Sequence, residues 1–118
     1  MSSLNTFGAI LTYAIELETN LHNFYRSAGN QERATEADKR REKLERARRE
    51  HVLEITLEPI DGLDENNYVF NLEDTSSNNQ AALESTAAQF YADVAPKINV
   101  RQAQRVLERC GKAHQALA

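Results

Sequence analysis

Apolar residues recur every three or four positions in four stretches of this chain, which is the spacing of one buried face of an α-helix. The pattern predicts helices at about residues 4–28, 35–57, 78–95 and 100–116. No stretch shows the apolar–polar alternation of a half-buried strand, apart from segments too short to count. We therefore expect an all-α protein in which a single domain spans residues 1–118.

Two short motifs each occur twice, in the same order. The pattern L-E-x5-F-Y begins at Leu17 and again at Leu83, and the pattern L-E-R-x4-H begins at Leu44 and again at Leu107. The separations are 66 and 63 residues. A pattern repeated at nearly constant spacing indicates a repeated structural unit, here a helical hairpin.

The stretch of about residues 59–77 between the second and third predicted helices is long for a compact domain. A two-fold axis between the two hairpins would account for its length. The chain would then have to travel the length of the bundle before the third helix begins. We therefore expect this stretch to be a long crossover connection.

Four side chains that can bear charge fall on the apolar faces of the predicted helices. They are Glu18, His51, Glu84 and His114. We expect all four to point into one core. A buried ionised carboxylate costs several kcal/mol unless it is paired or bound to a cation, so Glu18 and Glu84 require a compensating group.

The segment Ala14-Ile15-Glu16-Leu17-Glu18, followed by Phe24-Tyr25, and the segment Arg48-Arg49-Glu50-His51 resemble the ferritin-like superfamily, in particular rubrerythrin-like proteins. The resemblance implies a ferritin-like four-helix bundle of two hairpins joined by a crossover. Such bundles hold two metal ions with one Glu from each of two helices and a Glu-x-x-His motif from each of the others. The resemblance implies that Glu18 and Glu84 match the first kind of ligand.

His51 and His114 match the histidines of the second kind, but the acids that should precede them are missing. Arg48 and Gly111 stand three residues before the two histidines. A standard di-iron centre would therefore lose both bridging carboxylates. We expect the guanidinium of Arg48 to pair with Glu18, Glu84 or both, because arginine binds carboxylates in a bidentate geometry.

The competing interpretation is one Fe or Zn ion held by Glu18, His51, Glu84 and His114, since oxygen and nitrogen ligands in this number suit either metal. The two interpretations predict different functions. A salt-bridge network predicts a non-catalytic relative without a cofactor, whose bundle serves assembly or partner binding. A metal predicts an oxidoreductase or metal-handling protein with a reduced ligand set.

Charge and composition restrict the partners. The net charge is −4, which argues against a nucleic-acid partner, and the longest apolar run is too short and too soon interrupted by acids to span a membrane. Cys110 is the only cysteine, so no disulfide forms within the chain and we expect a cytoplasmic protein.

Residues 50–96 contain ten acids and no Lys or Arg, which makes the crossover at Asp61–Asp74 the most distinctive surface. We expect a homodimer, as is common in this superfamily.

Overall fold

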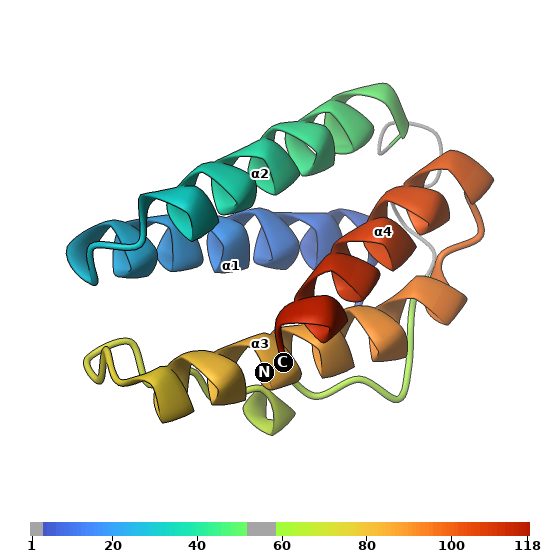
Figure 1. Cartoon of the computed structure of the whole chain (residues 1–118). Coiled ribbons are helices and arrows are strands. Elements are labelled where there is room, and N and C mark those ends of the chain that lie inside the picture. Colours follow the sequence, from blue (N-terminus) through green and yellow to red (C-terminus); the bar gives the residue numbers. More distant parts are fainter. Residues whose placement is uncertain (1–3, 52–58) are drawn as a thin grey trace.

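The computed structural model describes residues 4–51 and 59–118, and this part of the chain is all-α, as predicted (Figure 1). The elements in chain order are α1 (Phe7–Ser27), α2 (Gln31–His51), the 3-10 turn η2 (Glu65–Asn67), α3 (Ser77–Val94), the 3-10 turn η3 (Ala95–Lys97) and α4 (Arg101–Leu117). No strand occurs among the described residues. Residues 52–57, which the sequence pattern predicts to complete the second helix, and residue 58 lie outside the described residues.

The turn between α1 and α2 is built around Gly29. This residue has φ +78°, a backbone conformation that a side chain disfavours, and the N–H of Asn30 donates to the carbonyl oxygen of Tyr25 at 2.8 Å. This arrangement is a Schellman motif, which ends a helix and satisfies its last carbonyl groups. As a result α1 ends at Ser27, one residue before the end at about residue 28 that the sequence pattern predicts.

The second helix begins four residues earlier than residue 35, where the sequence pattern placed it. The side-chain oxygen of Asn30 accepts a hydrogen bond from the N–H of Arg33 at 3.2 Å and so caps the first turn of α2. An asparagine in this position satisfies one of the unpaired N–H groups at a helix start. Asn30 thus ends one helix and starts the next, which leaves a very short turn between them.

The described connection from residue 59 to residue 76 returns along the molecule, because α2 and α3 run in the same direction (Figure 1). Near the end of α3, the hydroxyl of Tyr68 donates to a carboxylate oxygen of Asp93 at 2.5 Å. Near the start of α3, the side-chain amide of Asn79 donates to the carbonyl oxygen of Asn71 at 2.7 Å. The connection therefore runs alongside α3 in the direction opposite to the helix.

The interior is filled by apolar side chains from all four helices. The largest that are fully buried include Ile10, Leu11, Leu21, Leu44, Leu83, Phe90 and Leu107. Burying one such side chain stabilises the fold by about 1.5–3 kcal/mol. Among the described residues, four buried side chains of this interior are polar or charged, and these form the candidate site.

Candidate functional site

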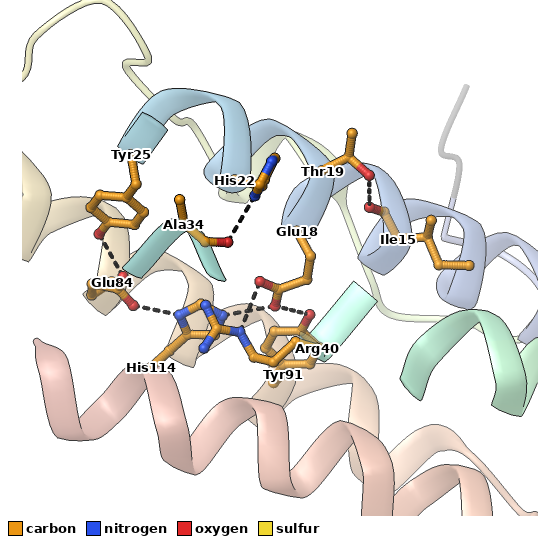
Figure 2. A network of polar contacts seen from close by, with 10 residues as sticks. All are labelled: Ile15, Glu18, Thr19, His22, Tyr25, Ala34, Arg40, Glu84, Tyr91 and His114. Carbon is orange, nitrogen blue, oxygen red and sulfur yellow. Dashed lines mark hydrogen bonds and ion pairs between the residues drawn. The ribbon is translucent and has the colours of Figure 1, made fainter. Parts of the chain in front are cut away.

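Four ionisable side chains meet in the interior, one from each helix (Figure 2). They are Glu18 of α1, Arg40 of α2, Glu84 of α3 and His114 of α4. The exposed fraction is 0% for Glu18, Glu84 and His114, and 7% for Arg40. Buried ions destabilise a protein unless they are paired and hydrogen-bonded, so the contacts among these four groups decide what the site can do.

His114 lies between the two carboxylates. Its Nε2 is 2.8 Å from Oε2 of Glu18, and its Nδ1 is hydrogen-bonded to Oε2 of Glu84. An ionised carboxylate only accepts hydrogen bonds, so between two ionised glutamates both ring nitrogens donate and the ring carries the positive charge of an imidazolium. Burial by itself would lower the pKa of His114, but the hydrogen bonds to the two glutamates raise it above its ordinary value.

Arg40 supplies the second positive charge. Its Nε donates to Oε1 of Glu18 at 2.9 Å. Burial opposes ionisation of Glu18, but the hydrogen bond from His114 and the charges of His114 and Arg40 hold the pKa of this carboxyl below its ordinary value. Burial opposes ionisation of the guanidinium, but the charge and hydrogen bond of Glu18 together with the charge of Glu84 raise its pKa above the ordinary value. The two carboxylates and the two cations therefore sum to zero charge.

Two tyrosines complete the network in a reciprocal manner. Tyr91 donates its hydroxyl to Glu18 at 2.6 Å, and Tyr25 donates its hydroxyl to Glu84 at 2.5 Å. Each tyrosine follows the glutamate of its own helix by seven residues, yet it binds the glutamate of the other helix. A two-fold axis between α1 and α3 would produce this exchange. Burial, with the neighbouring carboxylate, raises the pKa of both hydroxyls, so they remain protonated donors.

All four carboxylate oxygens are engaged. In Glu18, Oε1 accepts from Arg40, while Oε2 accepts from Tyr91 and contacts His114. In Glu84, Oε1 accepts from Tyr25 and Oε2 contacts His114. No buried side-chain nitrogen or oxygen among the described residues lacks a hydrogen-bond partner. Every carboxylate oxygen of the network thus has a hydrogen-bond partner, and the positive and negative charges balance.

The turns of the two hairpins determine which residues meet. Glu18 lies eleven residues before Gly29, and Arg40 lies eleven residues after it. Residues at equal distances from a tight turn face each other in two antiparallel helices. Glu84 and His114 are likewise each fifteen residues from Asn99, in the turn between α3 and α4. This register was the signal that could have identified Arg40 from the sequence.

The prediction that Arg48 neutralises the carboxylates is wrong. Arg48 is exposed, and its Nε donates to the hydroxyl of Thr12 at 3.1 Å. Arg40 makes the predicted contact instead, and it lies eight residues earlier, which is about 12 Å along a helix. The resemblance placed Arg48 at a ligand position of the family, but the register of the α1–α2 hairpin brings Arg40 opposite Glu18.

The structure does not bring His51 into this cluster. His51 is half-buried at the last described position of α2, and its Nε2 lies 3.8 Å from a carboxylate oxygen of Glu50. It is eleven residues from Arg40, about 16 Å along the helix. Glu18, Glu84 and His114 therefore meet without the fourth member of the expected ligand set.

Gly111 marks a close approach of α4 to α3. A Cβ atom at this position would lie 2.9 Å from Cβ of Tyr91, closer than real Cβ contacts allow. The family's metal-bridging acid on this helix therefore has no room in the observed packing. Since Arg48 occupies the other acid position, the residues present do not fit a dimetal centre. Within the described part of the chain, no group of three or more His, Cys, Asp or Glu side chains is arranged to hold a metal ion.

Two further side chains, His22 and Cys110, have structural roles. Nδ1 of His22 lies 2.8 Å from the carbonyl oxygen of Ala34, which links α1 to α2 at the edge of the core. Cys110 is buried. Burial, and to a smaller extent the negative charge of Glu18, raises the pKa of its thiol to about 12. This cysteine is therefore a thiol at neutral pH and packs as a small apolar group.

Comparison with known proteins provides no relative from which a function could be transferred. No protein-family model, curated protein or solved structure matches the chain. Over residues 4–51 and 59–118, none of the helices combines the length and apolar character that crossing a membrane requires. The interpretation of the site therefore depends on its own geometry.

Proposed function

We propose that this protein is a non-catalytic four-helix bundle of the ferritin-like type, which serves assembly or the binding of a protein partner. In this proposal, Arg40 and His114 provide the positive charge that metal ions provide in related bundles. The observation that carries the proposal is the closed network around Glu18 and Glu84 (Figure 2). It leaves no carboxylate oxygen without a hydrogen-bond donor.

The ferritin-like assignment is supported by two features of the arrangement. The chain returns along the bundle between α2 and α3, as a crossover connection requires (Figure 1). The exchanged hydrogen bonds of Tyr25 and Tyr91 relate the two halves in the way that a two-fold axis would. Both features agree with a bundle built from two similar hairpins.

A metal ion is disfavoured at this site on grounds of charge. A cation would have to enter next to the guanidinium of Arg40 and the imidazolium of His114, both of which repel it. His114 would also have to lose a proton, although its two carboxylate contacts favour the protonated ring. The metal-dependent alternative therefore requires that the network be dismantled before any ion binds.

The proposal is tested by elemental analysis and by thermal unfolding with added metal. We expect protein purified without chelators to contain far less than one equivalent of iron, zinc or manganese. We expect Zn²⁺, Mn²⁺ and anaerobic Fe²⁺ to leave the unfolding temperature unchanged, because an ion that binds only the folded state would raise it.

The matched control is the substitution Glu18→Gln, which removes a carboxylate that any metal at this site would need. One equivalent of bound metal, with a metal-dependent rise in unfolding temperature that the Glu18→Gln protein loses, would establish the metal-dependent alternative. A rise that Glu18→Gln retains would indicate binding elsewhere on the molecule, with the proposal for this site intact.

A further inference from the structure

The outer face of α4 carries a row of positive charges. The row consists of Arg101, Arg105, Arg109 and Lys112, and all four side chains are exposed. Among the described residues, none of the four forms an ion pair with a carboxylate. Glu108 is the one acidic residue in α4, so this face is strongly cationic in a protein of net charge −4.

The connection before α3 has the opposite character. Residues 61–74 contain five acids and no Lys, Arg or His. Within the described chain, no salt bridge involves the exposed acids Asp61, Asp64, Glu73 and Asp74. We refer to residues 61–74 as the acidic crossover.

The acidic crossover is a defined surface with two exposed apolar side chains. Val69 and Leu72 are 77% and 38% exposed, and they are the large apolar residues that the described chain leaves in solvent. Tyr68, which precedes Val69, is buried, and its ring packs edge-on against Phe90 with the ring centres 5.3 Å apart.

The later part of the acidic crossover runs along α3 on the side away from α4 (Figure 1), whereas its start at Asp61 lies beside Lys97 and Asn99, in the turn before α4. The acidic crossover is fixed to α3 by the hydrogen bonds of Tyr68 and Asn79, whereas α4 packs against α3 through Gly111 and Tyr91. Among the described residues no ion pair joins the two surfaces within one molecule, so their charges are available to a second molecule.

We propose that the chain self-associates head to tail, with the cationic face of α4 in one copy seated on the acidic crossover of the next. This inference rests on the assembly role proposed above and names the partner as a second copy of the chain. The charges of the two surfaces are complementary. The aliphatic stems of the arginines cover Val69 and Leu72 while their charged ends reach the surrounding carboxylates. A head-to-tail contact of this kind leads to rings or open chains.

A nucleic acid is the other class of partner that a cationic helix face attracts. Phosphates would bind the same four side chains. The acidic crossover and the net charge of −4 oppose a polyanion, and they favour a partner that is itself acidic over part of its surface. The chain itself is such a partner, so we infer self-association.

The test is sedimentation velocity of the full chain over a range of protein and salt concentrations. We expect association that grows with protein concentration at about 20 mM salt and is lost at about 500 mM, because salt screens exposed charges beyond a Debye length of several ångströms. Reversing charge on α4 (Arg105→Glu with Arg109→Glu) or on the crossover (Asp61→Lys with Glu73→Lys) should abolish association of each variant alone.

Mixing the two reversed variants should restore association, because each then carries the charges that the other needs. The matched control for the α4 reversal is Lys43→Glu with Arg49→Glu on exposed positions of α2, which changes net charge by the same amount in the same direction and should leave association intact. A wild-type chain that stays monomeric at low salt, or an α4 reversal with no effect, overturns the inference. Binding of a DNA or RNA oligomer by a monomeric wild-type chain assigns the face to nucleic acid instead. All of these outcomes are independent of metal content, so failure here is distinct from failure of the metal-free proposal.

Discussion

Arg40 and Arg48 illustrate how position along a helix, and not residue type, determines the role of a charge. Both are arginines of α2, yet Arg40 is 7% exposed and paired with Glu18, while Arg48 is exposed and bonded to a neutral hydroxyl. Removing one partner of a buried ion pair leaves the other charge without compensation, whereas an exposed contact contributes little.

We therefore expect Arg40→Gln to lower the free energy of unfolding by about 3–5 kcal/mol, and Arg48→Gln to change it by less than about 0.5 kcal/mol. Urea unfolding of both variants checks this difference. Adding Glu18→Gln to Arg40→Gln should recover part of the loss, because it removes the stranded charge. Equal losses for the two arginine variants would contradict the assignment of Arg40.

At the scale of elements, the close contact of α3 with α4 depends on Gly111. Glycine is normally unfavourable inside a helix by about 1 kcal/mol relative to alanine. Here its missing side chain lets the backbone of α4 approach Tyr91, whose ring also stacks on His114 with the ring centres 5.6 Å apart. The contact therefore connects helix packing to the geometry of the buried network.

Gly111→Ala should destabilise the protein by about 1–2 kcal/mol, despite the better helix propensity of alanine, because an added methyl group forces the two helices apart. The control is Lys112→Ala on the adjacent exposed position, which should stay within about 0.5 kcal/mol of the wild type. Thermal or urea unfolding measures both. A Gly111→Ala protein that is more stable than the wild type would show that α4 is not held this closely to Tyr91.

At the scale of the whole molecule, the buried network makes stability depend on pH from both sides. The pKa of His114 is raised in the folded state, so its contribution is complete below the ordinary value of 6.5 and declines as pH rises through the folded pKa. The pKa of Glu18 is lowered, so its contribution is complete above the ordinary value of 4.5 and is lost as pH falls through the folded pKa. The greatest stability is therefore expected between about pH 4.5 and 6.5.

Unfolding free energies measured from pH 6.5 to 8.5 should decrease for the wild type. His114→Gln should be less stable at pH 6.5 and show a much weaker decrease, because the titrating group is absent. His51→Gln should retain the wild-type decrease, since His51 lies outside the network. A wild-type profile that stays flat over this range would mean that His114 does not carry the buried positive charge.

The periodicity of the chain was sufficient to predict helices and their inward faces. It predicted an all-α protein and placed Glu18, Glu84 and His114 on buried faces, because the angular position of a residue follows from the 3.6-residue turn alone. It failed for Arg40, which stands in a run of charges where no apolar stripe distinguishes the inward position. The family resemblance then directed attention to Arg48 instead.

The sequence by itself determined which helix faces turn inward and how the charge is divided along the chain. The equal distances of Glu18 and Arg40 from Gly29 carry part of the register along the helix axes, but the tertiary structure decided that this turn is tight and that α4 approaches Tyr91 at Gly111. The physical reason is that helical periodicity is local, whereas the sliding of one helix along another is set by turn geometry and packing. Arg40 and His114 therefore meet the two glutamates, and His51 does not.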